Sequence, residues 1–350
     1  MRVVVVGASG NVGTSVIRSL SEESQVTSIL GLSRRRPGLE VAKVEWQTAD
    51  VTQSALEKLF RGADAIIHLA WLIQPGRDRA LTRAVNVDGS RRVFEATAAA
   101  QVPALVYASS VGAYSPGPKD RRVDETWPTG GVASSFYSSD KAAVEAMLDA
   151  FEAAHPRVRV VRLRPGLIFK REAASEIRRL FAGPFLPGSI LRPGLIPVMP
   201  KVDGLVFQAV HSDDVGDAYR LAATGNAAGA FNLAAEPVLD SARLAELFRA
   251  RLVPVPRRVL RGAADLTFRL RLQPSEPGWV DMALAVPLMD TSRARDHLGW
   301  RPTRTATDAL SDLMGGMRQG AGAHTPPLEP GGAGPGRIRE LLSGVGARRG

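Results

Sequence analysis

Val-Val-Val-Val-Gly-Ala-Ser-Gly-Asn-Val-Gly, residues 3–13, is the stretch that decides the fold. A short apolar run precedes three glycines at three-residue spacing, and residues 14–20 have the pattern of a helix. Gly7 lets the chain turn sharply out of a buried strand, Gly10 leaves the backbone open to a phosphate, and Gly13 allows helix and strand to pack closely. The helix N-terminus offers free N–H groups and the positive end of its dipole to an anion. The stretch therefore predicts a site for the pyrophosphate of a dinucleotide, at the start of a parallel α/β sheet.

A tyrosine and a lysine four residues apart, Tyr137 and Lys141, stand at the start of a helical pattern that extends over 136–154. Residues at positions i and i+4 share one helix face, so we expect the ammonium of Lys141 beside the phenol of Tyr137. An unperturbed phenol has a pKa of about 10, and a nearby cation lowers that pKa. The pair predicts a proton donor and acceptor that works at neutral pH.

An apolar strand pattern over 104–108 ends in two serines, Ser109 and Ser110. Ligands of open parallel sheets bind at the carboxyl ends of the strands, where a catalytic hydroxyl belongs. The glycine spacing, the Tyr-x-x-x-Lys pair and these serines resemble the extended branch of the short-chain dehydrogenase/reductase family, which includes epimerases and dehydratases. The resemblance covers most of residues 1–310.

The resemblance implies a role for each residue of the expected site. Ser110, with Ser109 as the second candidate, would bind the substrate oxygen, and Tyr137 would pass a proton to or from it. Lys141 would lower the pKa of that tyrosine and hold the cofactor ribose, and Asn86 would support a water or backbone link near Lys141. The residues expected to contact the cofactor are Gly7, Ser9, Gly10, Asn11, Val12, Gly13, Ser33, Arg34, Asp50, Val51, Leu69, Ala70, Asn86, Tyr137, Lys141 and Pro165.

The identity of the cofactor depends on the end of the predicted second strand, which reads Ser33-Arg34-Arg35-Arg36. Enzymes that use NAD usually carry an acidic residue there for the ribose hydroxyls, and a carboxylate would repel a 2′-phosphate. Ser33 and Arg34 can instead donate to that phosphate. The prediction is NADP, with NAD as the alternative if the arginines only form a solvated loop.

Composition bounds the other function classes. The chain has 350 residues and no cysteine, which excludes disulfides and thiolate chemistry, and no His, Asp and Glu residues have the spacing of metal ligands. A strand begins at the N-terminus and no apolar run reaches the roughly 18 residues of a membrane span, so we expect a cytoplasmic protein. The formal charge of +10 is spread over local arginine clusters without a nucleic-acid-binding module, so a nucleic-acid partner is not expected.

Alternating strand and helix patterns predict a doubly wound parallel sheet, the Rossmann fold, over 1–165, with 205–235 returning to it. Residues 166–204 and 236–317 would form a smaller, mainly helical substrate-binding cap, in which a basic amphipathic helix occupies 257–272. The Gly- and Pro-rich stretch 318–350 would be mostly disordered, with a brief helix over 338–342.

The expected reaction is hydride transfer between the nicotinamide and a carbonyl or secondary alcohol of a small, fairly apolar substrate. An arginine and an asparagine that serve the diphosphate in nucleotide-sugar epimerases are missing here, although Lys170, Arg171 or Lys201 can replace the arginine. An epimerase with tightly bound NAD is the first alternative, and a non-catalytic dinucleotide-sensing or RNA-binding protein is the second.

His68 and His211 are expected to be structural. Two helices over 83–100 and 136–154 are candidates for a homodimer interface.

Overall fold

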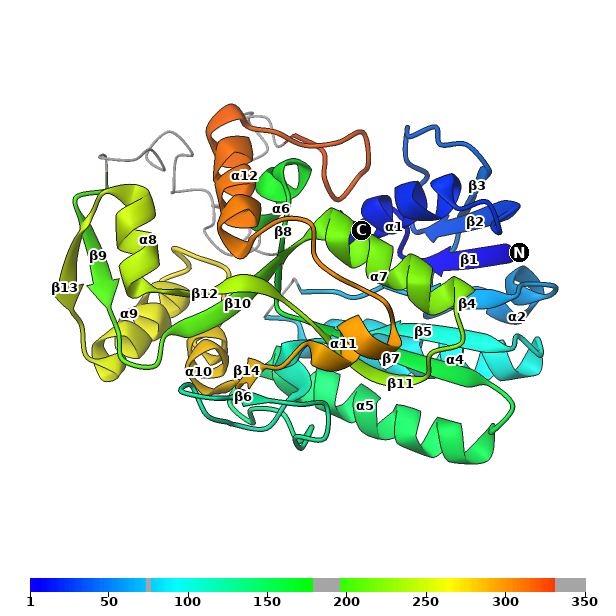
Figure 1. Cartoon of the computed structure of the whole chain (residues 1–350), viewed down its shortest axis with the longest axis horizontal. Helices are drawn as coiled ribbons and strands as arrows, with labels where there is room; N and C mark the ends of the chain where they lie inside the picture. The colour runs from blue at the N-terminus through cyan, green and yellow to red at the C-terminus, as the bar shows by residue number, and fades with distance from the viewer. Residues whose placement is uncertain (74–76, 179–195, 331–350) are drawn as a thin grey trace.

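A seven-stranded sheet forms the centre of the computed structural model, which describes residues 1–73, 77–178 and 196–330 (Figure 1). The strand order is β11-β7-β5-β4-β1-β2-β3, and every pair of neighbours in this sheet is parallel. The strands are short apolar runs because helices cover both faces of the sheet. The predicted doubly wound parallel sheet is confirmed. Its strands are β1 (Arg2–Val6), β2 (Ser28–Ser33), β3 (Val44–Thr48), β4 (Ala65–His68), β5 (Ala104–Ala108), β7 (Arg159–Pro165) and β11 (Gly229–Leu233).

Two hydrophobic cores lie on opposite faces of this sheet, and alternate residues of β1 enter each of them. Val3 and Val5 pack on the side that carries α1 (Asn11–Glu22) and α7 (Ser212–Thr224). Val4 and Val6 pack on the side of α2 (Leu56–Phe60), α4 (Gly89–Ala99) and α5 (Phe136–Ala154). This alternation follows from the two-residue repeat of a strand that is buried on both faces.

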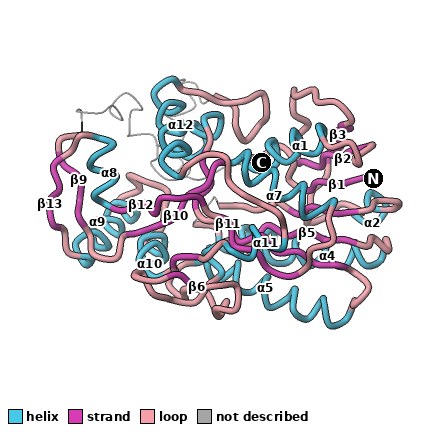
Figure 2. The backbone as a smooth tube through the Cα atoms, viewed as in Figure 1, coloured by secondary structure: helices cyan, strands magenta, loops and turns pink. Residues whose placement is uncertain are grey.

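A second, three-stranded sheet extends from the first and forms the centre of the cap, on the left in Figure 2. In it β10 (Val206–His211) pairs with β8 (Leu167–Phe169) and with β12 (Ala235–Asp240). The prediction that 205–235 returns to the central sheet is therefore wrong for β10, whereas β11 joins that sheet and α7 packs on it. Short apolar strands look alike in sequence, and β10 is instead covered by α12 (Ala306–Gln319).

The rest of the cap consists of short elements. Beyond the three-stranded sheet lie β9 (Val198–Lys201), α8 (Ser241–Phe248), β13 (Arg251–Pro254), α9 (Arg257–Arg269) and α10 (Gly278–Ala285). Smaller elements complete the described chain: β6 (Arg122–Val123), α6 (Ala174–Ile177), β14 (Leu288–Met289) and α11 (Ser292–His297). No helix within the described ranges is long and apolar enough to cross a membrane.

The helix predicted over 83–100 is present without a break, but it is not a single α-helix. It consists of α3 (Arg79–Arg83), a π-helical turn (Ala84–Asp88) and α4. The wider turn contains Asn86, whose side chain is buried. Such π turns are often found at functional sites.

The stretch that follows α12 is better ordered than predicted. Thr325 and Leu328 are buried, and the backbone N–H of Gly38 donates to the carbonyl of His324 at 3.0 Å. The expectation of disorder is thus wrong for 320–330. Burial of Leu328 and a few backbone hydrogen bonds suffice to hold this Gly-rich segment against the rest of the protein. Residues 179–195 of the predicted cap and the brief helix over 338–342 lie outside the described residues.

His68 ends β4 and is buried against aromatic rings. Its Nε2 is 2.9 Å from Ser90 Oγ, and its ring lies 6.0 Å from Phe94 and 5.8 Å from Tyr107, measured between centroids. Burial, with a smaller contribution from the charge of Lys141, lowers the pKa of His68 to about 3.

We expect this histidine to make folding stability depend on pH. Between about pH 6.5 and its folded pKa of about 3 the unfolded chain binds a proton at His68 that the folded chain does not bind. The free energy of unfolding therefore falls on acidification, by up to about 1.4 kcal/mol per pH unit from this group. Urea unfolding at about pH 7, 6 and 5 should show a shallower dependence for His68→Gln, whereas His155→Gln, an exposed control, keeps the original slope. Equal slopes for the wild type and His68→Gln would contradict this assignment.

Candidate active site

The glycine loop between β1 and α1 has the shape of a phosphate cradle. Gly7 has φ +89°, and a Cβ there would lie 2.6 Å from the backbone nitrogen of Ala70. A Cβ on Gly13 would lie 2.4 Å from the carbonyl oxygen of Gly7. At Gly10, by contrast, a Cβ would meet only that same oxygen, at 3.7 Å. The first and third glycines are therefore required by packing, whereas the second faces open space.

The N-terminus of α1 is directed at this open space without a capping side chain. Its N-cap residue is Gly10, so no side chain accepts from the first N–H groups of the helix. Asn11 uses its amide Nδ2 to bond the carbonyl of Ile168 at 3.3 Å, on the cap side. Uncapped N–H groups beside an open backbone fit the pyrophosphate of a dinucleotide.

The other residues expected to contact the cofactor surround the same edge of the sheet. Leu69 and Ala70 follow β4, and the N–H of Leu69 donates to the carbonyl of Val6 at 2.8 Å. Asp50 accepts at Oδ1 from the hydroxyl of Thr52 at 2.6 Å. Their neighbours at this edge are Ser9 and Val12 in the glycine loop, Val51 after β3, and Pro165 at the end of β7.

At the end of β2 the hydroxyl of Ser33 donates to the carbonyl of Arg35 at 2.8 Å, and Arg34 is exposed. No acidic residue occupies this strand end. The hydrogen bond folds the Ser-Arg-Arg turn back on itself, which leaves the Arg34 side chain in solvent next to the β2 terminus.

Tyr137 and Ser110 lie together. Tyr137 is in the first turn of α5, and its ring packs on Gly112, where a Cβ would be 2.8 Å from the tyrosine Cε1. The hydroxyl of Ser110 accepts from the N–H of Gly112 at 3.0 Å and forms a hydrogen bond with Tyr137. Ser109 points elsewhere, because its hydroxyl donates to Glu145 at 2.5 Å. The geometry therefore favours Ser110 over Ser109 as the serine beside the tyrosine.

The position of Lys141 differs from the prediction. Its Nζ donates to the carbonyl of Ala108 at 2.6 Å and lies 3.5 Å from the centroid of Trp71, but 5.9 Å from the ring centroid of Tyr137. Burial lowers the pKa of Lys141 well below its usual value, against the charges of Glu145 and Asp140. In this state the lysine does not lower the pKa of Tyr137, because a strand-end carbonyl and an indole face hold its ammonium instead.

The pKa of Tyr137 is raised, not lowered. Burial raises it, and the hydrogen bond with Ser110 offsets only part of that effect. A phenol with a pKa above its ordinary value of about 10 is protonated at neutral pH. Tyr137 is therefore a proton donor before any ligand binds.

Asn86 makes a backbone link, and its partner is Leu72. Its Oδ1 accepts from the N–H of Leu72 at 2.7 Å, and its Nδ2 donates to the carbonyl of Leu72 at 2.9 Å. Both ends of the amide are occupied by this clamp. Asn86 fixes the backbone that follows Leu69, Ala70 and Trp71, and so holds the edge where the nicotinamide end of a dinucleotide is expected.

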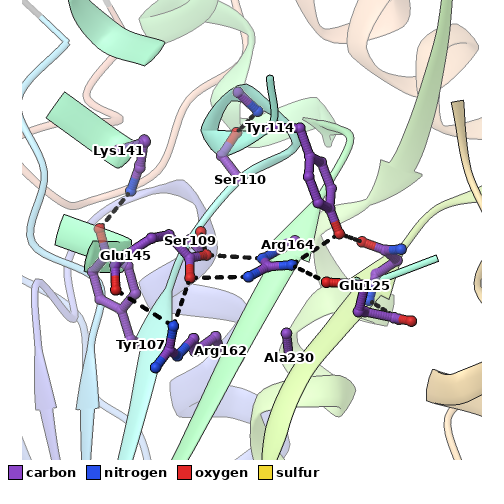
Figure 3. Close-up of polar contacts among 12 residues, drawn as sticks. Tyr107, Ser109, Ser110, Tyr114, Glu125, Lys141, Glu145, Arg162, Arg164 and Ala230 are labelled. Carbon is purple, nitrogen blue, oxygen red and sulfur yellow. Dashed lines mark hydrogen bonds and ion pairs between the residues drawn. The ribbon is translucent and has the colours of Figure 1, made fainter. Parts of the chain in front are cut away.

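A buried ion-pair network that the sequence analysis missed lies beneath the site (Figure 3). Glu145 is fully buried and accepts from Arg164 Nε at 2.8 Å, Arg164 Nη2 at 3.0 Å and Arg162 Nη1 at 3.0 Å, besides Ser109. Burial raises the pKa of Glu145, but the hydrogen bonds and charges of Arg164 and Arg162 bring it below its usual value. The signal in the sequence was the position of Glu145, four residues after Lys141 and on the same helix face.

Two tryptophans, also missed, flank the ring of Tyr137. Trp279 lies 4.8 Å from it and Trp71 lies 5.9 Å from it, both measured between ring centroids. A small pocket opens beside these rings, lined by apolar residues such as Leu72 and Phe136. Trp279 is far from Tyr137 in sequence, so only the packing of α10 against α5 brings the two together.

The charged residues of this pocket carry no excess of positive charge among the described residues. Arg79 lies 3.3 Å from Asp140, which is buried, and Glu276 accepts from the backbone N–H of Phe136 at 2.9 Å. One guanidinium thus faces two carboxylates. A diphosphate would lack cationic partners here.

The basic residues considered as replacements for the missing diphosphate arginine lie elsewhere. Lys170 is 1% exposed, and its Nζ donates to the carbonyl of Asn11 and the hydroxyl of Thr14, both at 2.6 Å. Arg171 bonds Gln319, and Lys201 lies on the exposed strand β9. That possibility is not supported, because Lys170 holds the base of the glycine loop and the other two do not line the pocket.

His211 has the hydrogen bonds of a structural residue, as expected. Its Nδ1 accepts from the N–H of Asp213 at 3.2 Å, at the start of α7, and its Nε2 lies 3.4 Å from Asp312. Over 1–73, 77–178 and 196–330, no group of three His, Cys, Asp or Glu residues could hold a metal ion.

Comparison with known proteins decides the family. The sequence profile of the NAD dependent epimerase/dehydratase family matches residues 3–234. The chain belongs to this family. The resemblance to extended short-chain dehydrogenases/reductases is confirmed.

An uncharacterised protein of Mycobacterium tuberculosis is 28% identical over 324 residues, which cover 91% of this chain but only 30% of that protein. A sterol-4-alpha-carboxylate 3-dehydrogenase of Candida albicans is 32% identical over 179 residues, 51% of this chain and 45% of the relative. Among solved structures, a UDP-glucose-4-epimerase from Stenotrophomonas maltophila with bound NAD has a TM-score of 0.69 at 21% identity. That match covers 91% of this chain and 98% of the epimerase. At this identity the likeness concerns the fold.

We predict that Glu145 is required for stability to a degree that its neighbour Glu152 is not. Glu145→Gln leaves the buried Arg164 without its charge partner among the described residues and removes one of three carboxylates from Arg162, which should lower the free energy of unfolding by about 3 kcal/mol. Glu152 also pairs with Arg162 but is 36% exposed, so Glu152→Gln should change it by less than about 1 kcal/mol. Urea unfolding of both variants measures the difference, and equal effects would disprove the special role of Glu145.

Proposed function

We propose that this protein is an NADP-dependent reductase that converts a ketone or aldehyde on a fairly apolar, partly planar substrate to the alcohol. The observation that carries the proposal is the pocket beside Tyr137, which aromatic and aliphatic side chains line together with Arg79, Asp140 and Glu276, so that its described lining has no net positive charge. Flat apolar molecules stack well on an indole ring such as that of Trp279, which lines this pocket. Membership of the epimerase/dehydratase family supports redox chemistry at a nicotinamide in general terms.

NADP is favoured over NAD by the end of β2. The exposed guanidinium of Arg34 is a donor suited to a 2′-phosphate, and no carboxylate stands there to repel it. The hydroxyl of Ser33 would donate to that phosphate by exchanging its bond to the carbonyl of Arg35. The glycine loop fits the pyrophosphate through the open backbone at Gly10 and the uncapped start of α1.

In this reaction the reduced dinucleotide supplies a hydride to the carbonyl carbon. Ser110 donates a hydrogen bond to the carbonyl oxygen and stabilises the negative charge that develops on it. Tyr137, which burial keeps protonated, gives its proton to the same oxygen. Lys141 lies one helical turn away. Burial disfavours its charged form, so it would stabilise the phenolate left behind once it is protonated and turns from Trp71 toward the site.

The sterol dehydrogenase of Candida albicans supports an apolar, polycyclic substrate class, although this chain spans only 45% of that relative. Solved neighbours of the same fold bind NAD together with nucleotide sugars, which keeps an epimerase with tightly bound NAD as the second candidate. The two functions differ in a simple observation. A reductase releases its cofactor after each turnover, whereas an epimerase retains NAD through purification.

The test of this function is NADPH oxidation with a panel of aryl and polycyclic ketones, run beside UDP-hexoses. We expect turnover with the ketones, and Tyr137→Phe should lower kcat at least about 100-fold because it removes the proton donor. The affinity for NADPH, measured by fluorescence titration, should stay nearly unchanged. Tyr219→Phe, a buried tyrosine of the other core, is the control and should retain activity.

Two outcomes would overturn the proposal. Interconversion of UDP-hexoses by protein that carries tightly retained NAD would establish the epimerase instead. Full ketone turnover by Tyr137→Phe would remove Tyr137 from the mechanism.

The preference for NADP gives a separate prediction. Ser33→Asp with Arg34→Ala should weaken NADPH binding at least about tenfold and strengthen NADH binding, because the carboxylate repels the 2′-phosphate and accepts from the ribose hydroxyls. Arg36→Ala, which removes an exposed arginine of the same run, should change neither affinity by more than about twofold. Unaltered preference in the double variant would show that the end of β2 does not select the cofactor.

A further inference from the structure

The cap helix α9 (Arg257–Arg269) is amphipathic, and none of its residues is buried. It lies at the outer end of the cap, far from the central sheet (Figure 1). Leu260, Ala264 and Phe268, spaced four residues apart, are half-buried and form its inner face, on the side of α10. The inner face attaches the helix to the rest of the cap. The opposite face has no such packing role among the described residues.

The outer face of α9 carries exposed apolar side chains. Val259 and Leu266 are each 57% exposed and Leu270, at the C-cap, is 59% exposed. Positions i, i+7 and i+11 fall on one side of a helix with 3.6 residues per turn, so these three form a stripe. Leu272, just beyond the helix, is 45% exposed. Of the nine exposed large apolar residues in the described part of the chain, four are in this stretch, which singles it out as an interaction surface.

Arginines lie along one side of the stripe. Residues 257–272 contain five arginines and one aspartate. Arg261 pairs with Asp281 at 2.8 Å and Arg269 pairs with Asp265 at 2.9 Å, whereas Arg258 and Arg271 extend into solvent without an ion pair among the described residues. The surface is therefore both apolar and basic.

We propose that the outer face of α9 binds the surface of a bilayer that contains anionic lipids. The apolar stripe, formed by Val259, Leu266 and Leu270, would enter between the headgroups. The arginines beside it would pair with lipid phosphates while their stems lie along the acyl boundary. This inference does not depend on the proposed reaction.

The charge of the surface favours lipid over a second copy of this chain. A two-fold contact brings the same patch of each copy together, which would set arginines against arginines. A lipid surface offers phosphates over the whole length of the helix, and an apolar layer below them that matches the stripe. The link from α9 to α10 also carries Glu276, and α10 carries Trp279, so a docked helix would hold the pocket beside Tyr137 near the bilayer.

The test is flotation of the full-length protein with vesicles of phosphatidylglycerol and phosphatidylcholine in about equal amounts, compared with phosphatidylcholine alone. We expect binding to the anionic vesicles at least about tenfold tighter than to the neutral ones, and weaker binding in about 1 M salt. Val259→Ser/Leu266→Ser/Leu270→Ser should weaken binding at least about tenfold through the lost apolar contact. Arg258→Gln/Arg269→Gln/Arg271→Gln should do so through the lost charge.

The matched control is Arg91→Gln/Arg243→Gln/Arg295→Gln, which removes the same charge from exposed positions on other helices and should leave vesicle binding within about twofold. Thermal unfolding and NADPH titration of each variant check that the fold is intact. Loss of vesicle binding by the control to the same degree as by the Arg258 variant would reduce the effect to net charge and overturn the proposal.

Because the chain has no cysteine, a single introduced cysteine can report on the surface directly. A polarity-sensitive dye on Leu266→Cys should shift to shorter wavelengths when anionic vesicles are added, and a dye on Arg91→Cys should not. A dye at Leu266→Cys that is already shielded without vesicles, in monomer or oligomer, would mean that protein covers this face and would overturn the proposal. Vesicle binding that the triple serine variant retains would overturn the proposal as well. So would equally tight binding of the protein to soluble polyglutamate, which offers negative charge without an apolar layer.

Discussion

The buried carboxylate of Glu145 joins the elements that form the site. It accepts hydrogen bonds from Ser109 after β5 and from Arg162 and Arg164 on β7, and it lies on α5 one turn after Lys141 (Figure 3). A fully buried carboxylate is stable only when it is surrounded by donors, so these neighbours cannot move independently. The spacing of Ser110, Tyr137 and Lys141 is thereby set by an ion pair that lies below the reacting groups.

Arg164 connects the Glu145 network to further elements of the sheet. It donates to the hydroxyl of Tyr114 at 3.1 Å and to the carbonyl of Glu125 at 2.9 Å, and Tyr114 in turn donates to Asn232 at 2.7 Å. The network thus extends from α5 through β7 to β11. A catalytic serine on a loop is usually mobile, but here the loop is attached to the middle of the sheet.

Burial also shifts the pKa values of Tyr137 and Lys141. The low-polarity surroundings that accommodate Trp71 and Trp279 raise the pKa of Tyr137 and lower that of Lys141, so both groups tend toward their neutral forms. A neutral phenol donates a proton, which suits reduction of a carbonyl. The same apolar surroundings suit a substrate with little charge, so the proposed reaction and the proposed substrate class have one physical cause. The exposed apolar stripe of α9, at the other end of the cap, is consistent with such a substrate without being required by it.

The sequence alone determined the sheet, the glycine loop and the order of the candidate catalytic residues, because these depend on local patterns. Three glycines at fixed spacing after an apolar run have few structural solutions, and Tyr137 and Lys141 share a helix face whatever surrounds them. Strand and helix positions in the first 165 residues follow from periodicity, as do the buried faces of β1.

Only the tertiary structure decided what each polar group contacts. Asn86 clamps the backbone of Leu72, Lys170 lies beneath the glycine loop, and β10 joins the cap sheet. Trp279 reaches Tyr137 from 142 residues away. Each of these outcomes depends on which of several chemically equivalent partners lies within hydrogen-bonding or packing distance. A long side chain such as lysine has many partners within reach, and the sequence does not order them in space. Helical and strand periodicity act over a few residues, whereas a hydrogen bond or a ring contact depends on how distant segments pack.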